Sequence, residues 1–133
     1  MTADTDPKTT IWRFTHWFPN KDDSKELKGE YMMRGYRRGD TLVLQSEPDA
    51  TGAYVLVRLN IEGSVASGSW HETAATDGEF SGTEYSGAGQ LIISDDGEKM
   101  EGLWVGAGMD HAQQKLRLYT DKWEIVHLPE TAV

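Results

Sequence analysis

The chain has 133 residues, enough for one domain that buries a core of its own. It contains no cysteine, which excludes disulfides, iron–sulfur clusters, zinc–thiolate sites and thiol catalysis. Its 22 acidic residues outnumber its 13 basic ones, and the formal charge of −9 argues against binding to nucleic acid or to an anionic membrane. With no apolar run near the ~18 residues of a membrane span and no secretion signal, we expect a cytoplasmic protein.

The chain divides into a short arm and one domain. Residues 1–10 are polar and without periodicity, so we expect a disordered N-terminal arm. Residues 11–129 read as one domain of strands separated by turn signals. The expected strands are 11–18, 30–38, 41–47, 53–62, 64–73, 82–94, 98–108 and 114–128.

Turn chemistry separates these strands. Gly39-Asp40, Glu62-Gly63 and Asp95-Asp96-Gly97 predict tight turns, and residues 48–52 and 77–78 predict further turns. The segment 19–29 is either a helical turn, begun at Asn20 and ended by Gly29, or a loop.

About eight strands with mostly short connections predict an all-β fold, a single antiparallel up-and-down β-barrel of the calycin type. A barrel of this size holds side chains or one small ligand. Glycines lie in or beside several strand patterns. They indicate barrel bends first and close approach of a ligand second; they are Gly82, Gly87, Gly89, Gly102, Gly106 and Gly108.

The segments SGSWHET, YSGAGQLIISDDGEKMEGLWVGAG and KLRLYTDKWEI carry a family resemblance. They resemble the β-barrel domain found C-terminal to helix-turn-helix domains in some actinobacterial regulators, and more loosely the avidins and lipocalins. The resemblance covers roughly residues 36–126. The matching residues are Gly68, Trp70, Glu72, Thr73, Tyr85, Gly87, Gln90, Leu91, Gly97, Met100, Gly102, Trp104, Val105, Gly106 and Trp123.

The chain also departs from that family. It has no helix-turn-helix segment, so DNA binding does not carry over. Ser86 stands where the family has histidine, and residues 113–118 replace an asparagine-threonine-glycine run. The resemblance therefore implies the fold more than it implies a function.

Aromatic and charged side chains share the strand faces that would line a barrel. Trp70 and Glu72 lie on one face of their strand, and Trp104 shares a face with Met100 and Gly102. Arg58 interrupts an apolar strand and is the expected partner of Glu72. Either these residues form a ligand pocket, or they are a structural ion pair with tryptophans closing the barrel. Two residues of the resemblance complete the candidate ligand site, Tyr85 and Gln90.

A second candidate site surrounds Tyr36. Three arginines flank it in an otherwise acidic chain: Arg34, Arg37 and Arg38. Arginine forks suit phosphate or carboxylate, which predicts a small anionic ligand such as a nucleotide. The alternative is a solvated hairpin in which the arginines pair with Asp40 and Glu47.

Metal binding and catalysis have little support. The four histidines, at 16, 71, 111 and 127, lack ligand spacing, and no hydrolase, zinc-protease or phosphate-loop motif occurs. We expect no enzyme, metal or cofactor. The first expected function is a non-enzymatic binding or sensor module for a small organic ligand in the lumen. The alternative is a protein-interaction or assembly module that works with a regulator or defence partner, or as a homodimer.

Overall fold

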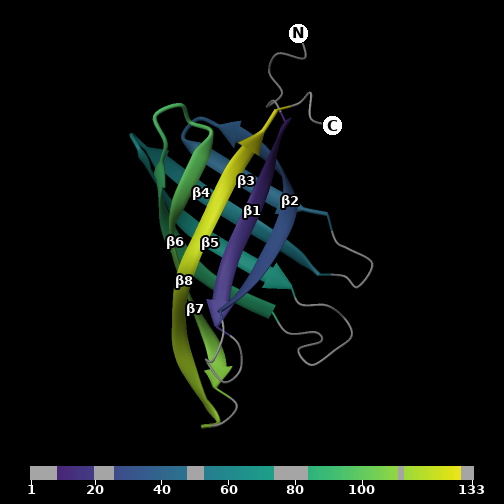
Figure 1. The fold of residues 1–133 in the computed structure, drawn as a ribbon, viewed down its shortest axis with the longest axis vertical. Helices are drawn as coiled ribbons and strands as arrows, with labels where there is room; N and C mark the ends of the chain where they lie inside the picture. The colour runs from purple at the N-terminus through teal and green to yellow at the C-terminus, as the bar shows by residue number, and fades with distance from the viewer. Residues whose placement is uncertain (1–8, 20–25, 48–52, 74–83, 111–112, 130–133) are drawn as a thin grey trace.

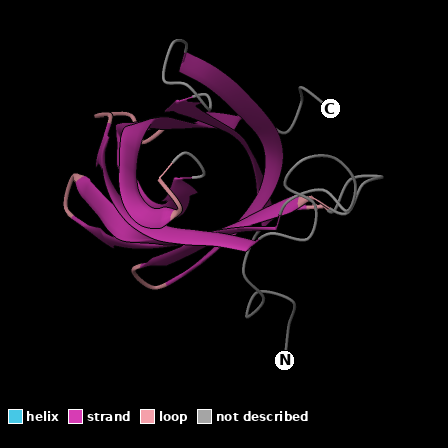
Figure 2. Cartoon of the chain, turned by 90° about the horizontal axis from the view of Figure 1, so that it is seen from below, coloured by secondary structure: helices cyan, strands magenta, loops and turns pink. Residues whose placement is uncertain are grey.

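Eight antiparallel strands form a closed barrel in sequence order, with β8 pairing to β1 (Figures 1 and 2). The computed structural model describes residues 9–19, 26–47, 53–73, 84–110 and 113–129, and every regular element in them is a strand. The predicted all-β, up-and-down barrel is confirmed. The strands are β1 Thr9–Pro19, β2 Glu26–Arg38, β3 Thr41–Ser46, β4 Tyr54–Glu62, β5 Val65–Thr73, β6 Glu84–Ile93, β7 Lys99–Asp110 and β8 Lys115–Leu128.

The largest difference from the predicted boundaries is in β2. This strand begins at Glu26, so a helix ending at Gly29 is wrong, while residues 20–25 lie outside the described residues. The reason is pairing: β1 and β2 run in unbroken register from Thr9–Tyr36 to Pro19–Glu26. Thr9 and Thr10 likewise belong to β1 rather than to the arm, of which residues 1–8 are not described.

Three glycine turns join strands at one end of the barrel, here called the turn end. Gly39, Gly63 and Gly97 have φ angles of 62°, 62° and 75°, a region that glycine enters without strain. The three predicted turns are therefore confirmed. The connections at the opposite end, the loop end, run through residues 20–25, 48–52, 74–83 and 111–112, so the turns predicted at 48–52 and 77–78 lie outside the described residues.

Apolar side chains fill the barrel from the turn end through its middle. Alternate residues of each strand point inward, as the period of two requires. Among the described residues, no helix is long and apolar enough to cross a membrane. The buried apolar core consists of Trp12, Phe14, Met33, Leu42, Leu44, Val55, Val57, Leu59, Ala66, Leu91, Met100, Trp104, Trp123 and Ile125.

Strand glycines make room for two inward-facing tryptophans, the partly buried Trp70 and the buried Trp123. A Cβ added to Gly106 would lie 2.6 Å from Cζ2 of Trp70, and one on Gly87 would lie 2.8 Å from the same ring. A Cβ on Gly89 would overlap the ring of Trp123. The rings of Trp70 and Trp123 thus occupy the space that a ligand would take beside these glycines. The glycines serve the packing of the interior.

This packing predicts the effect of one added methyl group. Gly89→Ala should lower the free energy of unfolding by about 1–3 kcal/mol, because the Trp123 indole must move out of a filled interior. Gly63→Asn is the control: a Cβ there meets nothing within 4 Å, and asparagine tolerates a positive φ. Urea denaturation measures both variants. Equal midpoints for the two would show that Trp123 does not rest on Gly89.

Candidate functional site

Three polar side chains meet inside the barrel towards the loop end, and we call them the inner polar cluster: His16, Tyr31 and Glu72. His16 and Tyr31 come from the consecutive strands β1 and β2, and Glu72 comes from β5, 41 positions after Tyr31. The Tyr31 hydroxyl donates a hydrogen bond of 2.9 Å to Glu72 Oε2. His16 Nε2 lies 4.0 Å from the same oxygen, too far for a hydrogen bond.

Glu72 is a carboxylate held mostly out of water. Its side chain is 22% exposed. Burial raises the pKa of the Glu72 carboxyl above its ordinary value, and the Tyr31 hydrogen bond partly offsets that shift. Among the described residues, no lysine or arginine lies within ion-pair distance of Glu72. The negative charge is therefore stabilised by one hydroxyl and by what solvent reaches it.

His16 is neutral at physiological pH. Burial lowers the pKa of its imidazole to about 4. The contact with Glu72 is consequently not an ion pair near pH 7, even though the two groups are 4.0 Å apart. Aromatic rings surround the imidazole: it stacks on Phe18 and Tyr31 with ring centroids 5.3 and 6.0 Å away, and Phe14 lies 5.4 Å away.

Two tryptophans lie beside the cluster on the inner face. Trp70 precedes Glu72 by two residues on β5, so both side chains point inward, and its ring meets that of Trp104 edge to face at 5.6 Å. Trp104 Nε1 donates to the carbonyl of Trp17 at 2.9 Å. The buried Nε1 of Trp70 has no hydrogen-bond acceptor among the described residues. Buried donors are rarely left in this state.

The structure gathers only some of the predicted site residues. Trp70, Glu72, Trp104 and Tyr85 face inward, and Tyr85 pairs in register with Glu72. The predicted Arg58–Glu72 pair is wrong. Arg58 alternates with the buried Val57 and Leu59 and is exposed on the outer wall.

Gln90 and Tyr36 also lie on the outer wall. Gln90 is exposed and alternates with the buried Leu91. Tyr36 is 40% exposed and follows Gly35, whose own position is buried. Because neighbouring residues of a strand point to opposite faces, neither side chain joins the interior residues.

The arginines around Tyr36 form a solvated hairpin. Arg34 Nε lies 3.5 Å from Glu47 Oε1 with both side chains largely exposed, the pairing that the solvated alternative predicts. Arg37 Nε donates to the Gly39 carbonyl at 2.9 Å. Exposed pairs of this kind contribute little to stability. Arg34 and Arg38 are exposed on the outer wall, and Arg37, on the face of the buried Gly35, is exposed at the turn end. All three lie apart from the inner polar cluster.

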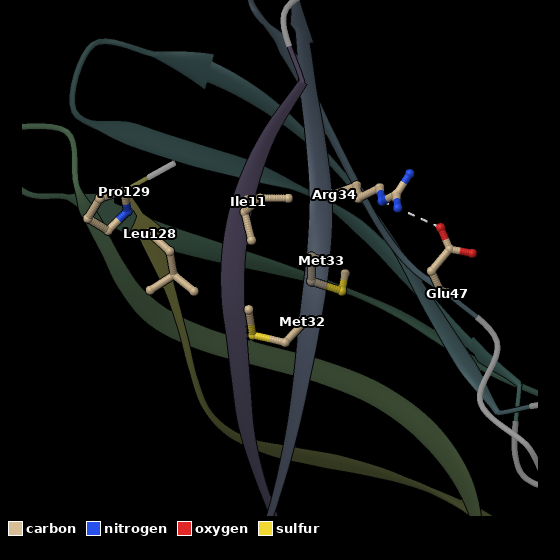
Figure 3. Close-up of a pocket in the computed structure, with 7 residues that line it drawn as sticks. All are labelled: Ile11, Met32, Met33, Arg34, Glu47, Leu128 and Pro129. Atoms are coloured by element: carbon tan, nitrogen blue, oxygen red, sulfur yellow. Dashed lines mark ion pairs between the residues drawn. The ribbon is translucent and has the colours of Figure 1, made fainter. Parts of the chain in front are cut away.

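Two hollows lie on the outer wall. The first has a volume of about 310 Å³ and is bordered by Ile11, Met32 and Leu128, with the Arg34–Glu47 pair at one side (Figure 3). The second, of about 460 Å³, lies over β4, β5 and β6 beside Arg58, His71 and Ser86. Both are partly open to solvent. Within the described ranges, no group of three or more histidine, aspartate or glutamate side chains could hold a metal ion.

Comparison with known proteins adds no assignment to this geometry. No protein-family model matches the chain, and no curated protein or solved structure matches it.

Sequence reasoning missed His16 and Tyr31 as site residues. His16 shares the alternating face of Phe14 and Phe18, which is a signal for an inward histidine. A second signal is Gly29, where a Cβ would lie 2.5 Å from His16 Nε2. Nothing local connects either residue to Glu72, which is 41 positions from Tyr31.

The buried neutral histidine predicts a pH-dependent stability. A folded-state pKa of about 4 against an ordinary 6.5 means that the unfolded chain binds the proton more tightly. The free energy of unfolding is therefore highest above pH 6.5, where His16 is neutral in both states. It falls by about 3 kcal/mol as the pH drops towards 4, because the unfolded chain takes up the proton first. His16→Gln should remove this slope, measured by urea unfolding at several pH values. The control is His71→Gln on the outer wall. Parallel profiles for His16→Gln and the wild type would contradict the assignment.

Trp104 predicts a graded loss of stability. Trp104→Ala should cost about 3–5 kcal/mol because the residue is 9% exposed and fills the interior. Trp104→Phe should cost less, since it keeps an aromatic ring but loses the hydrogen bond to the Trp17 carbonyl. The denaturant midpoint should be highest for the wild type, lower for Trp104→Phe and lowest for Trp104→Ala. An unchanged midpoint for Trp104→Ala would show that the indole does not pack inside.

Proposed function

We propose that this chain is a non-enzymatic binding module that takes a small organic cation at the loop end of the barrel interior. One observation carries the proposal: the Glu72 carboxylate faces the interior without a basic partner among the described residues. A partly buried carboxylate favours an opposite charge beside it, because that charge replaces lost hydration. A protonated amine supplies this charge.

The aromatic rings around Glu72 support the same ligand class. Phe18, Tyr31 and Trp70 are partly buried and pack against the core at this end. The faces of such rings attract cations, and their edges pack on an apolar ligand body. The unpartnered Trp70 Nε1 can donate to a hydroxyl or carbonyl group of the ligand.

The filled core limits where a ligand can bind. The turn end and the middle of the lumen are occupied by buried side chains, so binding deep in the barrel would need them to move. An anionic ligand is disfavoured at this site. No lysine or arginine among the described residues lies within ion-pair distance of Glu72, and the carboxylate of Glu72 would repel the anion.

Three matched compounds test the proposal: 2-phenylethylamine, 2-phenylethanol and phenylacetate. They differ mainly in carrying a positive, a neutral or a negative group. Quenching of tryptophan fluorescence should show the amine binding at least about tenfold more tightly than the alcohol, a difference of about 1.4 kcal/mol. Phenylacetate should bind most weakly.

Two variants make that result specific. Glu72→Gln keeps an acceptor for Tyr31 and removes the charge, so amine affinity should fall to that of the alcohol. Glu101→Gln, on the exposed outer wall of β7, should leave all three affinities unchanged. Absence of binding by any compound at 10 mM would overturn the proposal, and so would amine binding that is unaffected by Glu72→Gln.

Assembly is a second candidate function, and the outer wall favours it. Large apolar side chains are exposed on neighbouring strands: Ile92, Leu103, Val105, Leu116 and Leu118. The filled interior and this exposed apolar surface are the combination that the assembly alternative predicts. Exposed apolar surface of this kind often marks protein interaction sites.

A further inference from the structure

One edge of strand β8 is paired with another strand over only part of its length. Its pairing with β1 covers Trp123–Leu128, whereas its pairing with β7 extends down to Lys115. Residues 115–122 therefore pair with β7 on one side and with no described strand on the other. Figure 1 shows β7 and β8 continuing as a ribbon below the end of β1.

The alternation of hydrogen bonds identifies the groups at this edge. The His127 N–H donates to the Glu98 carbonyl beside β7 at 2.8 Å, and the β7–β8 register is unbroken. Odd-numbered residues of β8 thus bond towards β7, and even-numbered ones point away. Leu116, Leu118 and Thr120 consequently present their N–H and C=O groups to the free edge, while Asp121 Oδ1 accepts the N–H of Lys122.

The side chains along this edge are complementary to a second copy of themselves. Antiparallel pairing about a two-fold axis at Leu118 places Lys115 opposite Asp121 of the second copy. It places Arg117 opposite Tyr119 of the second copy, and within one chain Arg117 already lies 4.8 Å from the Tyr119 ring centroid. Opposite charges and aromatic pairs across strands stabilise a sheet.

The same register brings the most exposed leucines together. Leu118 would meet its own counterpart on the outer face, and Leu116 would meet Thr120. Leu116 and Leu118 are 70% and 72% exposed in the single chain. A register centred on Arg117 would instead oppose two arginines. One centred on Tyr119 would place Lys115 against Trp123, whose edge is already paired with β1.

We infer that a second copy of this chain docks on the free edge of β8, forming a continuous antiparallel sheet across the two barrels with Leu118 on the two-fold axis. The contact is isologous, so it closes as a dimer and does not propagate. It satisfies the edge groups of Leu116, Leu118 and Thr120 through hydrogen bonds between equivalent strands. The inference develops the assembly candidate and is independent of ligand binding.

The oligomeric state tests the inference first. Light scattering after gel filtration should give about twice the 14.9 kDa chain mass at 200 μM. Leu118→Lys should raise the dimer dissociation constant at least 100-fold, because it places two ammonium groups on the axis. Leu103→Lys, exposed on β7 away from the edge, is the control and should leave the constant unchanged.

A charge exchange tests the register. Lys115→Glu should weaken the dimer about tenfold by opposing Asp121 of the second copy. The double variant Lys115→Glu with Asp121→Lys should restore the constant to within about threefold of the wild type.

Cysteine cross-linking tests the axis directly, since the chain has no cysteine of its own. Hydrogen-bonded antiparallel partners have Cα atoms about 5.5 Å apart, within the span of a disulfide. Leu118→Cys should therefore oxidise to a covalent dimer. Thr120→Cys should not, because its counterpart lies four residues along the strand, about 14 Å away.

Each outcome is decisive for one part of the inference. A monomer at 200 μM overturns it and leaves the edge to solvent or to an extended segment of another protein. A dimer that Leu118→Lys does not weaken also overturns it, because the contact then lies elsewhere. A dimer that cross-links through Thr120→Cys instead of Leu118→Cys overturns the register.

Discussion

The pairing of the first strand with the last closes this barrel, and it is short. Only Ile11–His16 of β1 pair with β8, from Leu128 to Trp123. His16 stands at the last of these pairs, so the imidazole lies where closure ends. Below it, the indole of Trp104 ties β7 to the Trp17 carbonyl, and Lys122 lies over the Trp17 ring at 5.3 Å. The inner polar cluster and the free edge of β8 both follow from this limited closure.

The interior divides into a part that stabilises the fold and a part that costs stability. Buried apolar side chains, with Trp123 packed on Gly89 among them, fill the middle and the turn end, and this burial is the main favourable term in folding. At the loop end, the shifts in the pKa of His16 and of Glu72 both report burial of groups that prefer water. Such a concentration of unfavourable polar burial at one end is typical of binding sites.

The two proposals use different strands. The inner polar cluster lies on β1, β2 and β5, whereas the edge groups of Leu116, Leu118 and Thr120 lie on β8 and point along the sheet. The proposed ligand binding depends on the charge of Glu72 inside the barrel, and the proposed dimer depends on backbone groups and leucines at the free edge of β8. Substitutions that affect one are therefore expected to leave the other unchanged.

Most of the strands, and the face on which each of their side chains lies, could be predicted from alternation in the sequence. A period of two, interrupted by glycine turns, specifies antiparallel hairpins because successive side chains point to opposite sides. It also placed Trp70, Glu72 and Trp104 on inner faces. The same alternation sets Arg58 on the face opposite Val57 and Leu59, which by itself excludes a pair with the inward-facing Glu72.

Which residues meet inside the barrel could not be predicted in this way, because it depends on how the sheet closes. Closure brings β1, β2 and β5 around one end of the barrel, and this sets Tyr31 and His16 against a carboxylate that no local pattern connects to them. The stagger of the strands also leaves β8 longer than its partner β1, which creates the free edge. Contacts across a closed sheet depend on strand number and register together, and a sequence pattern specifies one strand at a time.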